Sequence, residues 1–276
     1  MNRRVFLISA SGMSAAVPAY ARFVEPEWLK FHQVNCKLFD DPRTEPVRLL
    51  HLSDLHASTS VPKSLIERAI DSGLAAKPDL ACLTGDFVTS RHGFDAAWLK
   101  RQLSRIAAAA PAFASLGNHD GGKWVRRFGG FESTADMAAL IRSSGVKLLH
   151  NENCEVQAKG RVFDLVGLGD LWSGEMRPER AFPQPSSKRV VLMSHNPDTK
   201  DLLHNYGWHL MLSGHTHGGQ LSLPYFGTPF APVRDHRYVE GLKGWNGRLI
   251  HVTTGVGNLH GVRFNCRPEV SFLLLQ

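Results

Sequence analysis

Apolar runs recur along the first half of the chain at the spacing of buried strands. Each run is short and is bounded by turn residues, which is typical of strands buried on both faces. The expected strands cover residues 47–52, 79–84 and 112–116. Two intervening segments, residues 63–76 and 95–110, carry apolar residues at helical spacing and run directly into Lys77-Pro78 and Pro111. Because proline ends a helix, each helix is expected to stop there.

The second half of the chain continues the alternation with a stronger strand bias. The expected strands cover residues 161–167, 189–194, 208–213, 249–254 and 270–275, and one short helix covers residues 199–205. Alternating helices and strands predict a largely parallel sheet with covering helices, so the pattern alone assigns the chain to the α/β class. The 276 residues contain no internal repeat or low-complexity linker, which favours one folded domain after the N-terminal segment.

Five of the expected strands run into residues that commonly bind metal ions. In chain order the clusters are Ser-Asp54-Leu-His56, Thr-Gly-Asp86, Gly-Asn118-His119-Asp120, Ser-His195-Asn-Pro and Ser-Gly-His215-Thr-His217-Gly-Gly. Singly, each has an ordinary explanation, because aspartate after a strand often caps the next helix and histidine at a strand end is often a structural polar residue. Ligands bind beyond the carboxyl ends of the strands in such sheets. The ordered recurrence of the clusters therefore favours one shared metal site.

The donors in these clusters suit a pair of divalent cations that act on a phosphate ester. A phosphate ester is an anion that repels nucleophiles, and water is a weak nucleophile at neutral pH. Two cations about 3.5–4 Å apart address both problems, because they bind the phosphoryl oxygens and acidify a water molecule between them. Such a pair needs a mixture of oxygen and nitrogen donors with one shared carboxylate, and the five clusters contain them.

In this order, the motifs resemble those of the calcineurin-like metallophosphoesterases. The resemblance runs from about Pro46 to the C-terminus and rests on Asp-x-His, Gly-Asp, Gly-Asn-His-Asp, a lone histidine and Gly-His-x-His. The extended Gly-His215-Thr-His217-Gly-Gly-Gln220 and the later Val262-Arg263-Phe264-Asn265 resemble the exported YkuE/YaeI-type subgroup of bacterial phosphodiesterases. The resemblance implies a four-layer α/β/β/α sandwich for residues 46–276.

The resemblance also implies which side chains bind each of two metal ions. The first ion would have four ligands, Asp54, His56, Asp86 and His217. The second would also have four, Asp86, Asn118, His195 and His215. Asp86 would therefore bridge the two ions. Imidazole, carboxylate and amide donors without thiolate suit several transition metals, and we expect manganese or zinc, with iron as the alternative.

Two further residues are expected to be catalytic on the strength of the same resemblance. His119 would contact the substrate phosphate and protonate the leaving oxygen, and Asp120 would orient it. A histidine general acid typically contributes about 10²–10⁴-fold in rate. Loss of His119 should therefore lower the rate without emptying the metal site.

The expected reaction is hydrolysis of a phosphate ester by a hydroxide that bridges the metals. The stretch Gly85-Asp-Phe-Val-Thr-Ser-Arg-His-Gly93 departs from the Gly-Asp-x-Val-Asp-Arg-Gly pattern of protein phosphatases. A phosphodiester or pyrophosphate is the better candidate substrate, carried by an envelope lipid or a nucleotide-linked sugar. Two alternatives stay open: a UDP-2,3-diacylglucosamine pyrophosphatase-like enzyme of lipid A synthesis, and a non-catalytic envelope protein that metal ions stabilise. The presence of His119, which would bind neither metal, favours an enzyme.

The N-terminus has the form of an export signal. Asn2-Arg3-Arg4-Val5-Phe6-Leu7 resembles a twin-arginine motif, and Ala19-Tyr20-Ala21 has the A-x-A form of a cleavage site. The weakly apolar stretch between them is too short to span a bilayer stably. We therefore expect a signal peptide at residues 1–21, a lead-in at residues 22–45, and a periplasmic or cell-envelope location. The alternative is a cytoplasmic tail that contains Arg-Arg by chance.

Composition narrows the partners without identifying them. The hydrophobic fraction of 43% and the charged fraction of 21% are those of an ordinary folded protein. The formal charge of +7 suits an anionic substrate or peripheral contact with an anionic membrane. The basic residues are scattered and no nucleic-acid motif accompanies them, so we expect no nucleic-acid-binding module. The oligomeric state stays open.

Overall fold

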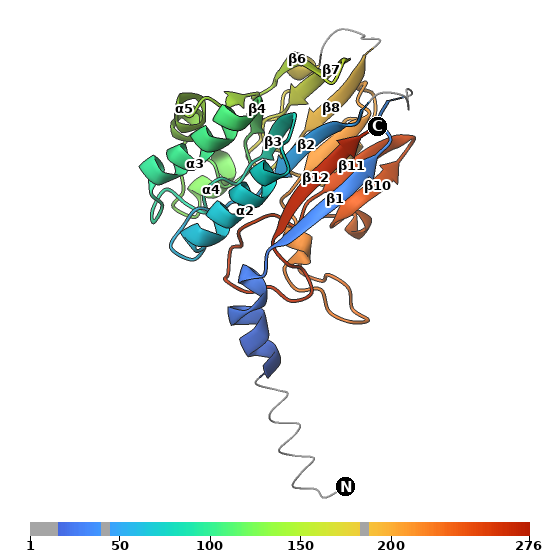
Figure 1. Ribbon diagram of the computed structural model, residues 1–276. Coiled ribbons are helices and arrows are strands. Elements are labelled where there is room, and N and C mark those ends of the chain that lie inside the picture. The colour runs from blue at the N-terminus through green and yellow to red at the C-terminus, as the bar shows by residue number, and fades with distance from the viewer. Residues whose placement is uncertain (1–15, 40–44, 183–187) are drawn as a thin grey trace, which may run out of the picture.

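The strands form two six-stranded sheets in the computed structural model, which describes residues 16–39, 45–182 and 188–276. In the first sheet the order is β1-β12-β2-β3-β4-β5 (Lys30–Cys36, Glu269–Leu275, Val47–Leu52, Leu80–Thr84, Ala112–Ser115 and Lys147–Leu148). In the second it is β10-β11-β9-β8-β7-β6 (Gly241–Trp245, Arg248–Val252, Leu210–Ser213, Arg189–Met193, Arg161–Gly167 and Glu152–Ala158). Figure 1 shows the two sheets with the helices outside them.

Both sheets have a parallel centre and antiparallel pairs toward their edges. Strands β2, β3, β4 and β5 are parallel in the first sheet, as are β7, β8, β9 and β11 in the second. Strand β12 runs antiparallel to β2, and β6 and β10 are antiparallel edge strands. Parallel strands place their carboxyl ends at one edge, so each sheet presents several loops there.

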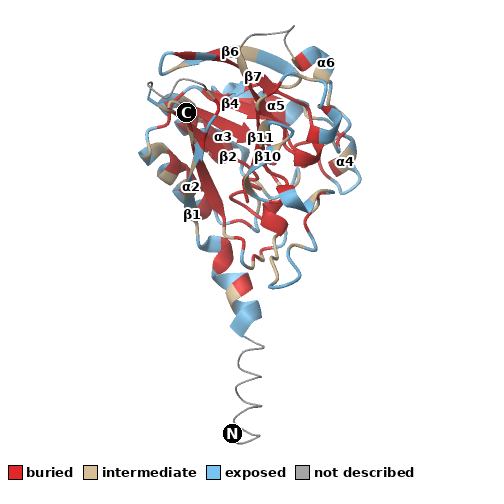
Figure 2. Cartoon of the chain, turned by 90° about the vertical axis from the view of Figure 1, so that its right-hand side faces the viewer, coloured by how far each residue is buried: buried red, intermediate tan, exposed pale blue. Residues whose placement is uncertain are grey.

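The hydrophobic residues divide into layers that follow the strand alternation. Leu49 and Leu212 belong to a core between the two sheets, because alternate side chains of β2 and β9 point inward. Leu50 and Leu52 point the other way and pack under the helices of the first sheet. The burial map in Figure 2 shows the sheets buried and the outer helix surfaces exposed.

The helical layers on the two outer faces differ in thickness. Helices α2 (Lys63–Ala75), α3 (Ala96–Ala109) and α5 (Ala135–Ser143) cover the first sheet, and Asp95 caps α3 by accepting a hydrogen bond from the Trp98 N–H. The second sheet is covered by short elements: α6 (Pro178–Ala181), η2 (Pro197–Leu202) and η4 (His236–Tyr238). Further short helices are α4 (Lys123–Arg126), η1 (Glu25–Glu27) and η3 (His217–Gly219). The expected α/β/β/α sandwich is confirmed, with a thin fourth layer.

Most expected elements are found within a residue or two of their predicted bounds, but two expectations need correction. The lead-in is part of the fold, because its residues 30–36 form β1 and pair in register with β12. The boundary at residue 46 is therefore too late for the folded unit. The helix expected at residues 199–205 is a 3₁₀ turn that ends at Leu202. Strands β6 and β10 and helix α5 were not expected.

The N-terminal segment is described from residue 16, where a short helix over residues 16–23 begins. The twin-arginine motif lies outside the described residues, and the predicted cleavage point after Ala21 falls inside this helix. None of the helices in the described ranges combines the length and the apolarity that crossing a bilayer requires.

Candidate metal centre

The five motif clusters meet where loops from the two sheets face each other. Loops after β2, β3 and β4 bring their residues from the first sheet, and loops after β8 and β9 bring theirs from the second. All the predicted ligands are buried although they are charged or polar: Asp54, His56, Asp86, Asn118, His195, His215 and His217. The side chains separate into two groups of potential metal ligands. The spatial convergence expected from the sequence is therefore present.

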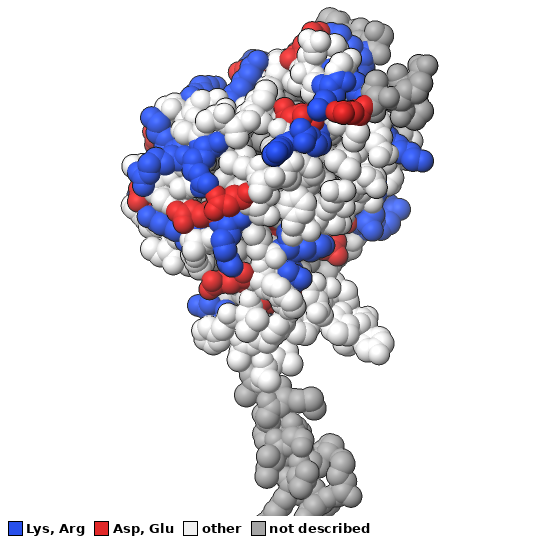
Figure 3. Space-filling model, in the orientation of Figure 1, with Lys and Arg blue, Asp and Glu red and all other residues white. Residues whose placement is uncertain are grey.

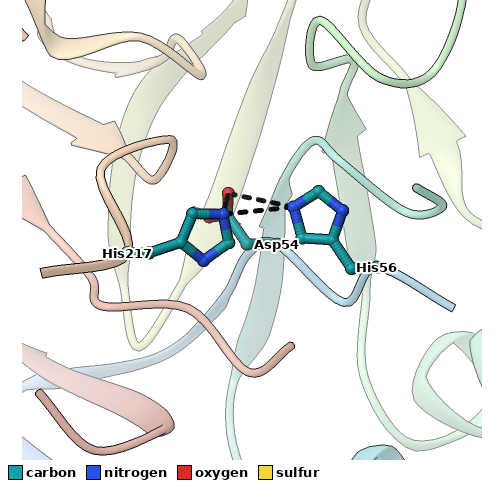
Figure 4. A group of neighbouring side chains, drawn as sticks. All are labelled: Asp54, His56 and His217. Atoms are coloured by element: carbon teal, nitrogen blue, oxygen red, sulfur yellow. Dashed lines mark hydrogen bonds and ion pairs between the residues drawn. The ribbon is translucent and has the colours of Figure 1, made fainter. Parts of the chain in front are cut away.

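The first group consists of Asp54, His56 and His217, whose ring nitrogens and carboxylate oxygen point at one another in Figure 4. The Nε2 atoms of His56 and His217 lie 3.1 Å apart. Asp54 Oδ1 is 3.4 Å from His217 Nε2 and 3.9 Å from His56 Nε2. Three donor atoms thus converge on one small volume, as a cation requires.

The second group consists of Asp86, His195 and His215. His195 Nε2 lies 3.2 Å from Asp86 Oδ2 and 3.3 Å from His215 Nδ1. The same Oδ2 is 3.6 Å from His56 Nε2, so Asp86 reaches both groups. This position agrees with the bridging role expected for Asp86.

The side chains themselves indicate that cations fit here. Asn118 Oδ1 and His215 Nε2 are buried without a hydrogen-bond partner among the described residues, and such polar atoms are costly unless something binds them. Burial lowers the pKa of His56 and of His215 to about 3, which keeps the rings neutral as metal ligation requires.

Excess negative charge at the second group also indicates that a cation fits there. Burial alone would lower the pKa of His195, but the carboxylates of Asp86, Asp54 and Asp170 raise it to about 10. The carboxylates therefore attract a positive charge into this volume. A divalent cation supplies that charge and leaves His195 free to act as a ligand.

The backbone at the centre is held in an unusual conformation. Five of the predicted ligands have positive φ: Asp54 (54°), His56 (44°), Asp86 (53°), His215 (69°) and His217 (51°). Non-glycine residues rarely adopt this region, and such strain concentrates at functional sites. Gly214 explains part of the tight geometry, because a Cβ there would lie 2.1 Å from Asp54 Oδ2. The loops are thus shaped to aim side chains inward.

The predicted role of Asp120 is wrong. Its carboxylate accepts hydrogen bonds from the backbone N–H groups of Gly117 (2.8 Å), Asp86 (2.8 Å) and Phe87 (2.7 Å). Asp120 therefore ties the loop after β4 to the loop after β3 and positions Asp86. Its two oxygens are directed at these amides. The ring of His119 instead bonds the Thr89 carbonyl.

His119 is oriented by a backbone carbonyl. Its Nδ1 donates to the Thr89 carbonyl oxygen at 2.8 Å, and its backbone N–H donates to Asp86 Oδ1 at 2.8 Å. The ring packs edge-on against His56 and Trp124. Because Nδ1 is engaged, Nε2 is the ring nitrogen left for a ligand. No residue pattern around Thr89 pointed to this contact, since a carbonyl can be offered by any residue type.

A cavity of about 510 Å³ opens beside both ligand groups, and sequence reasoning missed most of its wall. Its polar end contains Asp86, Asn118, His119, His215 and His217. The rest is mainly apolar, with Trp124, Trp172, Leu221, Phe230, Pro232, Leu259 and Val262, and it also includes Thr216, Gly219, Gln220 and His260. Trp172 lies edge-on over His215 with ring centroids 4.3 Å apart, and it also contacts Trp124.

A buried arginine supports the loop that carries His217. The Arg263 guanidinium donates to the carbonyl oxygens of Cys266 (2.8 Å), Thr254 (2.9 Å) and Gly255 (3.1 Å) and reaches that of His217 at 3.5 Å. Arg263 is fully buried. One side chain thus satisfies carbonyls from separate turns that surround the metal centre.

Replacing Arg263 by methionine should lower the free energy of unfolding by about 3 kcal/mol, because several buried carbonyls lose their donor. Urea denaturation of the metal-free protein would measure this loss apart from metal binding. Arg237→Met is the matched control, since its side chain is 78% exposed and should change stability little. Equal unfolding midpoints for the two variants would contradict the supporting role of Arg263.

Comparison with known proteins identifies the family. The calcineurin-like phosphoesterase family model matches residues 47–219, and the chain therefore belongs to this family. It is 41% identical to phosphodiesterase YaeI of Escherichia coli (strain K12), over 100% of this chain and 99% of that protein. The chain is a metal-dependent phosphoesterase, and the family expected from its motifs is confirmed.

More distant relatives also align along most of their length. UDP-2,3-diacylglucosamine pyrophosphatase LpxG of Chlamydia muridarum is 25% identical over 98% of both chains. The metallophosphoesterase YkuE of Bacillus subtilis is 28% identical over 100% of this chain and 98% of its own length. Among solved structures, NAD nucleotidase of Haemophilus influenzae is 13% identical with a TM-score of 0.47, over 78% of this chain and about half of its own (51%).

Proposed function

We propose that this enzyme is a two-metal phosphodiesterase that is exported by the twin-arginine pathway and acts in the cell envelope. Manganese or zinc is the proposed metal, with iron as the alternative. The likeness to a phosphodiesterase along the whole chain supports this substrate class. The observation that carries the proposal is the cavity beside the two ligand groups, which is large, mainly apolar and adjacent to His119.

The lining of the cavity favours diesters over monoesters. Among the described residues that line it, none is lysine or arginine. A monoester dianion would therefore find no lysine or arginine among these residues to complement its second charge. A diester carries one charge and has two substituents, one of which can occupy the apolar wall near Trp124 and Trp172. Exclusion of water by these indole rings would also strengthen electrostatic interactions at the phosphorus.

The protein's own groups divide the work of the reaction. Cations at the two ligand groups would polarise the phosphoryl oxygens and lower the pKa of a water molecule between them. Asp86 holds the two groups in register, and Asp120 fixes the backbone that carries Asp86. His119, held through Nδ1 by the Thr89 carbonyl, presents Nε2 to the leaving oxygen and donates the proton that it needs.

A pyrophosphatase acting on a nucleotide-linked diacyl sugar is the second candidate. The apolar cavity wall and the full-length likeness to LpxG favour it. The proposed export signal counts against it, because nucleotide-linked sugars are cytoplasmic substrates. A non-catalytic, metal-stabilised envelope protein is the least favoured, since His119 lines the cavity without belonging to either ligand group.

A substrate panel separates these candidates. The purified enzyme, loaded in turn with Mn²⁺, Zn²⁺ and Fe²⁺, would be assayed with bis-p-nitrophenyl phosphate, p-nitrophenyl phosphate, a nucleotide-linked sugar and a glycerophosphodiester. We expect kcat/KM for the diester to exceed that for the monoester by at least about tenfold, or about 1.4 kcal/mol. Preference for the monoester, or activity that survives complete chelation of metals, would overturn the proposal.

A further inference from the structure

An uncharged segment with exposed aromatic side chains projects from the loop that follows the metal ligand His217. Residues 220–232 contain no Asp, Glu, Lys or Arg. Tyr225, Phe226 and Phe230 are 105%, 81% and 67% exposed. The segment forms the orange loop at the lower right of Figure 1, and the corresponding projection in Figure 3 shows no charged side chain. We call residues 220–232 the aromatic loop.

The backbone conformation at the tip of the aromatic loop does not favour the tyrosine that occupies it. The Phe226 N–H donates to the Leu223 carbonyl at 3.2 Å, which closes a tight turn over Pro224 and Tyr225. Tyr225 has φ of 68°, where glycine or asparagine is the favoured residue. Neither local conformation nor packing within the chain accounts for tyrosine here. A residue that breaks a local rule without compensation points to a function.

The N-terminal helix lies at the same end of the molecule and adds to the apolar surface. The Arg263 N–H donates to the Ala21 carbonyl at 2.9 Å, and Tyr20 contacts Phe264 with ring centroids 6.4 Å apart. Phe264 in turn forms a β-bridge with Leu221 of the aromatic loop. Figures 1 and 2 show the helix leaving the domain at the end where this loop projects.

Exposed apolar residues continue along that helix. Phe23 and Val24, which follow the predicted cleavage point after Ala21, are 72% and 50% exposed. Together with the aromatic loop they form a surface that we call the apolar end. Arg22 lies within the helix, and Arg234 and Asp235 follow the aromatic loop along the chain. A projecting apolar surface with basic residues in the neighbouring segments is typical of proteins that insert side chains among anionic lipids.

The cavity opens between the same segments. Leu221, Phe230 and Pro232 of the aromatic loop line it, and so do Leu259 and Val262 of the segment that contacts the N-terminal helix. The apolar wall of the active site is therefore continuous with the apolar end. A ligand with a long apolar substituent could extend from the metal centre to this surface without crossing a charged border.

We propose that the apolar end docks on a phospholipid bilayer with an anionic surface and inserts Tyr225 and Phe226 among the lipids. A bilayer suits this surface better than a second protein because the aromatic residues lie on a projection, and a fluid phase accommodates a projection without a complementary hollow.

Docking in this orientation defines a substrate class, an inference that rests on the proposed phosphodiesterase function. The mouth of the cavity would lie at the level of the lipid head groups. The substrate would be an amphipathic phosphodiester whose apolar part follows the wall formed by Leu221, Phe230 and Val262. Its phosphate would reach the ligand groups while the lipid stays partly in the bilayer.

Sedimentation with vesicles tests the docking directly. The full-length chain would be mixed with vesicles of phosphatidylethanolamine and phosphatidylglycerol, and the bound fraction measured at low and high salt. In the variant Tyr225→Asn/Phe226→Ser, asparagine suits the positive φ, so the turn should persist. The matched control is Val162→Ser/Leu202→Ser, whose positions are 40% and 54% exposed outside the apolar end. Thermal unfolding would verify that both variants fold.

We expect the unaltered chain and the control to bind vesicles also at high salt, and the tip variant to bind at least about tenfold less tightly. All three should hydrolyse bis-p-nitrophenyl phosphate equally, because Tyr225 and Phe226 do not line the cavity. Equal vesicle binding by all three, or no binding, would overturn the proposal. A dimer that the tip variant dissociates, without vesicle binding, would also overturn it and assign the surface to a second copy. Failure of soluble diester hydrolysis in the unaltered chain would instead overturn the proposed function and leave the docking result intact.

Discussion

Replacing Asp86 by alanine is expected to lower kcat/KM for phosphodiesters by about three orders of magnitude or more, which corresponds to about 4 kcal/mol of transition-state stabilisation. The reason is its position. Asp86 Oδ2 lies within reach of His195 in one ligand group and His56 in the other, and Oδ1 holds the backbone of His119. One substitution therefore disturbs both groups and the general acid at once.

The metal content of the Asp86→Ala variant should be measured together with its rate. We expect Asp86→Ala to retain fewer metal ions per chain after dialysis than the unaltered enzyme. Asp136→Asn, an exposed aspartate in the first turn of α5, is the control and should keep both activity and metal. Retention of full activity by Asp86→Ala would refute the shared-ligand arrangement, whatever its metal content.

His119→Ala is expected to lose rate without losing metal: kcat should fall by about 10²–10⁴-fold while the metal content stays unchanged. His119 belongs to neither ligand group, and its ring is held by the Thr89 carbonyl beside the cavity. A general acid matters most when the leaving group is a poor one. The loss should therefore be large for an alkyl ester and small for a p-nitrophenyl ester.

The dependence on leaving group distinguishes catalysis from a structural effect. Loss of folding or of metal would reduce both esters equally, whereas loss of a proton donor would not. His204→Ala is the matched control, because His204 is exposed and its ring nitrogen Nδ1 bonds the nearby Asp201 carbonyl. Equal losses for the two esters in His119→Ala would show that His119 does not protonate the leaving oxygen.

The elements that position the metal centre could be predicted from the sequence because they are buried on both faces. Strand β2 was expected at residues 47–52 and occupies those residues, and β3 and β7 are similarly close. A strand covered on both sides consists almost entirely of apolar residues, so it contrasts with its flanks. The ligands directly follow such strands, which explains why their positions could be predicted from the sequence.

The edge strands could not be predicted because their patterns are weak. In β1 burial alternates between intermediate and exposed, with Phe31 exposed and His32 partly buried. Strand β10 contains two glycines and a lysine in five residues, and none of its residues is fully buried. These strands owe their conformation to their partners β12 and β11. Such stabilisation depends on distant sequence and leaves little local signal.

The finer features of the site were also beyond sequence reasoning. Asp120 binds three backbone amides instead of the imidazole of its neighbour, a choice that depends on how two loops approach each other. The cavity wall brings Trp124 and Trp172 beside residues from the aromatic loop. Because these residues lie far apart along the chain and match no short motif, only the fold shows that they share a wall.

The central claim is that two cations occupy the two ligand groups with Asp86 between them. Anomalous scattering from crystals of the metal-loaded enzyme, combined with elemental analysis of the same preparation, tests it most directly. We expect two metal ions per chain, about 3.5–4 Å apart, one beside Asp54, His56 and His217 and the other beside His195 and His215. A single ion, or two ions that do not share Asp86, would contradict it.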